Sequence, residues 1–245
     1  MGLILEVCVD SLAGLAAAVA GGADRVELCS ALELGGLTPS AGVMAAAAGC
    51  GVPVLAMIRP RSGDFVWSEA EVAAMLADIA AARVAGLAGV VLGASLPDGR
   101  LDVGVLERLA AAAGRLDLTL HRCFDLVPDM DVALEEAVAL GFRRVLTSGG
   151  AMTAAAGEAR IGRLVERAAG RIAVMAGAGV TVETAPGLLA VGVRELHGSC
   201  AEPVAAPGKV SEMGFGPKIA RRTSAARVRA LKQVMEAAGG VQRHV

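Results

Sequence analysis

The chain has 245 residues, of which 55% are apolar and 20% are charged, and this composition excludes a disordered or fibrous protein. Its 23 basic and 25 acidic side chains give a formal net charge of -2. The chain therefore lacks the broad positive field that attracts nucleic acids and anionic membranes. Aromatic residues make up only 2% of the chain, too few for base-stacking platforms. We therefore expect a small ligand, with no nucleic acid and no membrane as partner.

Short runs rich in Val, Leu, Ile and Met alternate with Ala-rich stretches that end in glycine, which is typical of strands alternating with helices. Helix starts are recognisable too, because Ser68 and Glu71 have the spacing of a capping box. Strands so uniformly apolar are covered on both faces, as in parallel sheets. Eight strands are expected, at residues 3–9, 25–29, 54–59, 89–93, 118–124, 144–148, 172–176 and 194–199.

Eight strand and helix units in 245 residues predict an α/β fold, a single-domain (β/α)8 barrel of the TIM type over residues 1–245. An open, doubly wound sheet is the alternative, but Val9-Asp10-Ser11 follows the first strand where a dinucleotide-binding protein has its glycine fingerprint. We therefore expect no nucleotide cofactor.

Residues 201–223 contain three Pro and three Gly and predict a long irregular loop near the barrel mouth, before a C-terminal helix. This loop is either a lid or a passive connection.

The first two expected strands both contain the pattern Glu-x-Cys, as Glu6 and Cys8 and as Glu27 and Cys29. Alternate side chains of a barrel strand point to the interior, and neighbouring strands lie ~4.8 Å apart. If the two segments are in register, the two Glu form one layer and the two thiols form the next layer toward the C-terminal face. This predicts a pair of thiols, with the alternative that each Cys is simply a small buried apolar residue, which is the commoner role of a single Cys.

Polar residues and glycines also follow the other strands, at the end of a barrel where enzymes of this fold place their chemistry. Arg59 and Arg61 could clamp a carboxylate or phosphate, with a buried ion pair of Arg59 as the alternative. His121 is a candidate general base and Asp125 the carboxylate that orients it. Glycine turns after the last two strands are common phosphate sites. Further ligand-binding candidates are Glu6, Arg122, Thr147, Ser148, Gly149, Gly177, Gly179, His197, Gly198 and Ser199.

The chain contains, in order, the segments LEVCVDS (5–11), GADRVELCS (22–30), GGLTPS (35–40), MIRPRSGDF (57–65), HRCFD (121–125) and RVLTSG (144–149). Together these six segments resemble the CutC family. The resemblance extends over about residues 3–200 and implies a cytoplasmic (β/α)8 barrel that forms homodimers or larger homo-oligomers and serves copper homeostasis. It also implies Cu(I) as the bound ion, with Cys8 and Cys29 as its ligands. Cys123, which stands where the family more often has Ala, is a candidate third ligand. The odd number of cysteines and the lack of a basic leader agree with a cytoplasmic protein.

Two functions remain open at this point. The first is a Cu(I)-binding protein that holds the ion through the Cys8 and Cys29 thiolates at the C-terminal face, because soft Cu(I) prefers sulfur donors. The second is a barrel enzyme that acts by acid/base chemistry on a small phosphate- or carboxylate-bearing metabolite. In that enzyme Glu27 or His121 is the acid/base, and Arg59 with the glycine turns holds the anion. A copper carrier has no need of the arginine and imidazole groups, which keeps the enzyme as the alternative.

Overall fold

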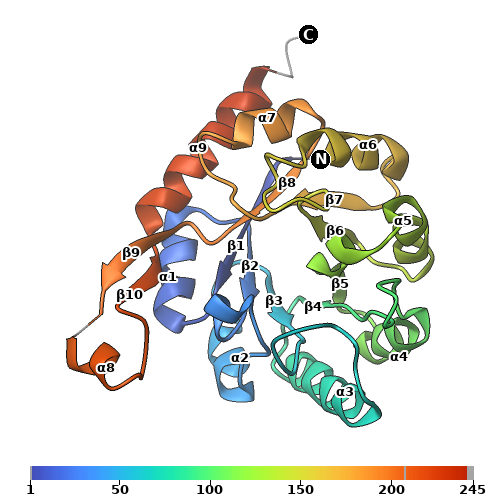
Figure 1. Cartoon of the computed structure of the whole chain (residues 1–245). Helices are drawn as coiled ribbons and strands as arrows, with labels where there is room; N and C mark the ends of the chain where they lie inside the picture. Colours follow the sequence, from blue (N-terminus) through green and yellow to red (C-terminus); the bar gives the residue numbers. More distant parts are fainter. Residues whose placement is uncertain (1, 207, 242–245) are drawn as a thin grey trace.

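The computed structural model describes residues 2–206 and 208–241, and its eight parallel strands close into a barrel (Figure 1). The (β/α)8 fold expected from the sequence is confirmed. Residues 1, 207 and 242–245, which belong to the predicted domain, lie outside the described residues. The barrel strands are β1 (Ile4–Val9), β2 (Arg25–Leu28), β3 (Val54–Met57), β4 (Gly89–Leu92), β5 (Asp117–Leu120), β6 (Arg144–Thr147), β7 (Ala173–Ala176) and β8 (Glu195–Gly198).

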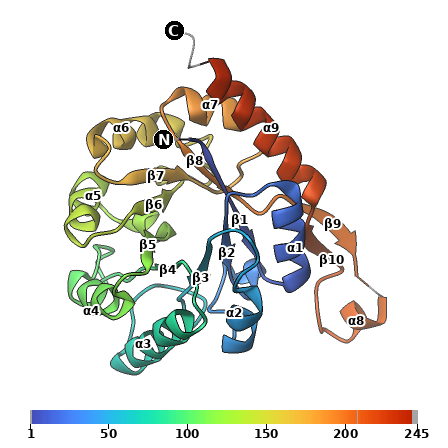
Figure 2. The same ribbon diagram turned by 180° about the vertical axis from the view of Figure 1, so that it is seen from behind.

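Helices surround the barrel and cover the outward faces of its strands (Figure 2). The capping box predicted at the start of α3 (Glu69–Val84) is present, since the Ser68 hydroxyl accepts from the Glu71 amide and the Glu71 carboxylate accepts from the Ser68 amide. In the described part of the chain, no helix is both long and apolar enough to cross a membrane. The helices are α1 (Leu12–Gly21), α2 (Ala41–Ala47), α3 (Glu69–Val84), α4 (Val103–Ala113), α5 (Met130–Ala139), α6 (Glu158–Ala168), α7 (Ala185–Ala190) and α9 (Ala225–Val241), with short 3-10 turns η1 (Leu32–Leu34) and η2 (Arg122–Leu126).

Residues 201–223, expected as an irregular loop, instead contain a β-hairpin. Strands β9 (Ala201–Ala205) and β10 (Ile219–Thr223) pair antiparallel, and the short helix α8 (Gly208–Glu212) lies in the connection between them. The far end of the hairpin extends outward beyond α1 rather than across the barrel (Figure 1). Only its base reaches the barrel mouth, where Ala201 and Arg221 line a cavity. The sequences of these strands, AEPVA and IARRT, lack both the apolar run and the regular alternation that would have predicted them.

The register between β1 and β2 differs from the expected one by two residues. Glu6 lies opposite Arg25 and Cys8 lies opposite Glu27, so the two Glu-x-Cys segments do not form matching layers. The prediction of a glutamate layer below a thiol layer is therefore wrong. The observed register places a carboxylate beside a guanidinium, whereas the expected one would have placed two buried carboxylates side by side, which is unfavourable without a cation.

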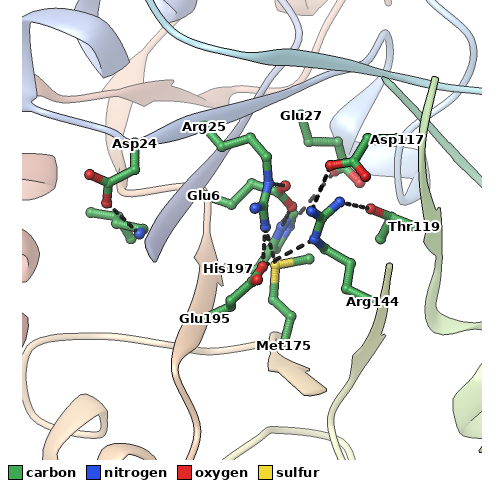
Figure 3. Close-up of polar contacts among 11 residues, drawn as sticks. Glu6, Asp24, Arg25, Glu27, Asp117, Thr119, Arg144, Met175, Glu195 and His197 are labelled. Carbon is green, nitrogen blue, oxygen red and sulfur yellow. Dashed lines mark hydrogen bonds and ion pairs between the residues drawn. The ribbon is translucent and has the colours of Figure 1, made fainter. Parts of the chain in front are cut away.

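A network of ion pairs fills the lower barrel interior, near the start of the strands (Figure 3). We call it the ion layer. Arg25 pairs with Glu6 and, at 2.5 Å, with Glu195. Arg144 pairs with Glu195 at 3.1 Å and with Asp117 at 2.8 Å. Each of the two guanidiniums of the ion layer thus faces two carboxylates, which meets the requirement that a charge removed from water be paired.

Replacing Arg25 tests the contribution of the ion layer. Arg25→Met leaves the fully buried Glu6 carboxylate without its cation, and we expect the free energy of unfolding to fall by about 3 to 5 kcal/mol. Urea denaturation measures this quantity. Arg100→Met is the matched control, since Arg100 pairs with Asp98 on an exposed turn, and its loss should stay below about 1 kcal/mol. Equal losses in the two variants would show that the ion layer does not stabilise the barrel.

The ion layer also predicts acid sensitivity. Burial alone would raise the pKa of Glu6, but the Arg25 cation and a hydrogen bond with His197 outweigh it and lower the pKa from 4.5 to about 2. A lowered folded-state pKa contributes stability that is present above 4.5 and is lost as the pH falls to about 2. Urea titrations at several pH values across this range should show a shallower pH dependence for Glu6→Gln than for the wild type. Parallel curves would contradict the assignment.

Candidate functional site

A cavity of about 930 Å³ opens at the C-terminal ends of the barrel strands. This volume lies in the range of sites that hold small molecules. The loops after β7 and β8 form one wall, with Ala178 and Cys200 in left-handed backbone conformations at φ 75° and 46°. The wall carries several chemically reactive side chains, among them Cys8, Glu27, Arg59, His121, Arg122 and His197.

Cys8, Glu27 and His197 form a compact group in this wall, which we call the Cys8–Glu27–His197 cluster. One ligand atom from each residue lies within 4.8 Å of the others, and all three residues are buried. The closure of the barrel creates the cluster, because β8 pairs with β1 on one side and β2 pairs with β1 on the other. The sulfur, nitrogen and oxygen atoms of the cluster are together a set of metal donors.

The imidazole of His197 contacts the ion layer through Glu6 (Figure 3). Its Nδ1 lies 2.8 Å from Glu6 Oε1, while its Nε2 lies 3.7 Å from Glu27 Oε2. Glu6 therefore touches both Arg25 and His197 without itself being one of the described residues that line the cavity. A carboxylate bound to one imidazole nitrogen leaves the other directed at the site, as in many metal and acid/base centres.

The thiols expected as copper ligands occupy different environments. Cys8 belongs to the cluster and lines the cavity. The Cys29 thiol lies behind Glu27, to which it donates a hydrogen bond with an Sγ to Oε2 distance of 3.5 Å, and burial together with the Glu27 charge raises its pKa. Cys123 is also fully buried, and burial and the nearby Asp125 raise its pKa to about 12. Neither Cys29 nor Cys123 is among the described residues that line the cavity.

Arg59 points into the cavity wall without an ion pair in the described part of the chain. Its guanidinium donates to the backbone carbonyls of Leu34, Gly36 and Gly63 at 2.9, 3.2 and 2.9 Å. The alternative in which Arg59 forms a buried ion pair with Glu27 or Glu6 is therefore not observed. Its Nε has no hydrogen-bond partner among the described residues.

Asp125 does not orient His121, contrary to the expectation from sequence. The chain turns into η2 directly after His121, and this turn carries Asp125 toward β6. There the carboxylate accepts from the Thr147 hydroxyl at 2.5 Å and from the Ser148 amide at 3.0 Å, and it pairs with Arg122 at 2.7 Å. Asp125 thus ties the ends of β5 and β6 together instead of acting on the imidazole.

The remaining sequence candidates fall into two groups. Gly179, Gly198 and Ser199 line the cavity together with the reactive side chains already named. Outside the described cavity wall lie Glu6, Cys29, Arg61, Asp125, Thr147, Ser148, Gly149 and Gly177.

Sequence reasoning did not select several residues that line the cavity, among them Phe65, Cys200, Arg221 and Arg227. The two arginines come from the hairpin and from α9, and both donate to the Ala201 carbonyl. No short motif predicts them. The only feature of the sequence that draws attention to this region is the pair of adjacent arginines, Arg221-Arg222.

Comparison with solved structures shows where similar barrels occur. CutC from Streptococcus agalactiae is 35% identical, with a TM-score of 0.77, and the match covers 80% of this chain and 98% of that one. Thiamine phosphate pyrophosphorylase from Pyrococcus furiosus has a TM-score of 0.59 but only 16% identity over 96% of both chains, so this likeness concerns the fold alone.

Comparison with known sequences gives closer relatives. The protein named family protein CutC from Rhizobium meliloti (strain 1021) is 57% identical to this chain over 236 residues, which is 95% of this chain and 96% of the relative. A family protein CutC from Agrobacterium fabrum (strain C58) is 53% identical and covers 96% of this chain and 95% of the relative. The model of the CutC family matches residues 3–202. The chain therefore belongs to the CutC family.

Proposed function

We propose that this protein binds a copper ion at the Cys8–Glu27–His197 cluster and serves copper homeostasis. The solved CutC from Streptococcus agalactiae is described as a candidate copper homeostasis protein, which supports this general role. The observation that carries the proposal is the convergence of three donor atoms within 4.8 Å in the barrel mouth.

The donors of the cluster suit copper. Thiolate and imidazole are the side-chain donors that copper ions prefer, and Cys8 and His197 supply one of each. Glu6 on the far side of the His197 ring would keep Nε2 available as a ligand atom. Cys29, whose thiol is hydrogen-bonded to Glu27, is a further sulfur donor in this proposal and must lose its proton to bind.

Anaerobic Cu(I) titration against a chromophoric chelator tests this function. We expect one ion per subunit in the wild type and a loss of affinity of about 100-fold or more in Cys8→Ser and in His197→Gln, because each variant removes a donor. Cys50→Ser is the matched control, since the half-buried Cys50 thiol donates only to the Val52 carbonyl. If a Cys8→Ser/Cys29→Ser double variant bound Cu(I) like the wild type, the proposed site would be wrong.

A second candidate function is acid/base catalysis on a small anionic metabolite. The observation that favours it is the size of the cavity, about 930 Å³, which far exceeds the space of one ion. Glu27 is the proposed acid/base, because Oε1 of its buried carboxyl has no partner among the described residues. In this reaction the carboxylate accepts a proton from a carbon next to a carbonyl or acid group of the metabolite and returns a proton to it.

Proton exchange in deuterated water tests this second function. Proton NMR of a panel of small carboxylates and phosphate esters should show loss of a carbon-bound proton signal on incubation with the wild type. Glu27→Gln should abolish the exchange, because an amide cannot accept the proton. Glu107→Gln, an exposed change on α4, should leave it intact. Absence of exchange from the whole panel would count against catalysis at this site.

A further inference from the structure

We propose that Arg59 and His121 form an oxyanion-binding subsite in the cavity, which holds the carboxylate or phosphate group of a small metabolite. This inference rests on the second candidate function and identifies the atoms that would bind its substrate. It also gives His121 a different role from the one expected, that of a hydrogen-bond donor in place of a general base.

The first argument concerns the charge of Arg59. The residue is 6% exposed, and all the acceptors of its hydrogen bonds are neutral backbone carbonyls. The two guanidiniums of the ion layer, by contrast, each face two carboxylates. A buried cation without a counter-charge is unfavourable, and an anion bound in the cavity would remove that cost.

The second argument concerns the proton on His121. Its Nδ1 accepts a hydrogen bond from the Cys123 amide at 3.2 Å, so the proton of the neutral ring lies on Nε2. Burial and the Arg59 charge lower the pKa of His121 to about 3, which keeps the ring neutral under ordinary conditions. The buried Nε2 has no acceptor among the described residues. It is a donor that lacks an oxygen atom to bind.

The third argument is that one aromatic ring touches both groups. The Arg59 Cζ lies 4.9 Å from the centroid of the Phe65 ring, and the Phe65 and His121 ring centroids are 4.7 Å apart. The Arg59 guanidinium and the His121 ring are therefore both next to Phe65, which itself lines the cavity. An entering oxyanion would displace this ring and accept hydrogen bonds from the charged guanidinium of Arg59 and from the neutral imidazole of His121. This pair of donors favours an acceptor with negative charge.

The location in the cavity agrees with a role in substrate binding. Arg59 and His121 follow β3 and β5, while the Cys8–Glu27–His197 cluster belongs to β1, β2 and β8, and all of these residues line the same cavity. A metabolite held by its acid group at Arg59 and His121 can thus extend toward Glu27. The acid group supplies binding energy away from the reacting atoms, as in many enzymes.

Calorimetric titration of the metal-free protein with inorganic phosphate and, separately, with acetate tests the subsite and distinguishes the two oxyanions. We expect one site per subunit for at least one of them, and a loss of affinity of about tenfold or more in Arg59→Met and in His121→Asn. Asn keeps an acceptor for the Cys123 amide and removes the Nε2 donor. Arg61→Met is the matched control, because Arg61 lies in the same loop and pairs with Asp64 and Glu71 at the surface.

A second readout keeps the test independent of variant folding. Trp67 is the only tryptophan of the chain, and its ring lies edge-on to Phe65 at 6.2 Å, so displacement of Phe65 should change its fluorescence in the wild type. The proposal is overturned if neither anion binds the wild type, or if both variants bind like it. Binding without proton exchange would refute the catalytic function alone, whereas exchange that survives in Arg59→Met and in His121→Asn would refute the subsite alone.

Discussion

The buried contact of Glu6 with Arg25 and His197 connects the two halves of the barrel interior. On one side the carboxylate belongs to the ion layer, and on the other it fixes the imidazole of the cluster. Each function of Glu6 depends on the other, because a carboxylate this deeply buried needs the guanidinium to stay charged, and the imidazole needs a charged carboxylate to stay oriented. The packing that stabilises the fold is thus also what positions the functional group.

Much of the architecture could be predicted from the sequence because each strand and helix is encoded locally. Apolar runs and terminal glycines mark the eight strands within a few residues, and the Ser68 capping box marks a helix start. The hairpin of residues 201–223 could not be predicted, since its strands have no apolar face that alternates with a polar one. Local patterns determine elements well and long-range pairings poorly.

The candidate site was predictable only in its residue types. Cys8, Glu27, Arg59, His121 and His197 were all singled out, and all line the cavity. Their partners were not, because partners depend on register and barrel closure: the contact between Glu6 and His197 joins residues 191 positions apart. Asp125 illustrates the same limit, since its proximity to His121 in the sequence predicted a contact that the η2 turn prevents.

The offset between β1 and β2 means that the repeated Glu-x-Cys pattern is not an internal symmetry of the barrel. The residue across from Cys8 is Glu27. The Cys8 and Cys29 sulfurs therefore differ both in their depth in the barrel and in their access to water. Engineering a symmetric two-sulfur centre on this scaffold would require the second cysteine at position 27, and moving the repeat as a unit to another barrel would reproduce the spacing without reproducing the geometry.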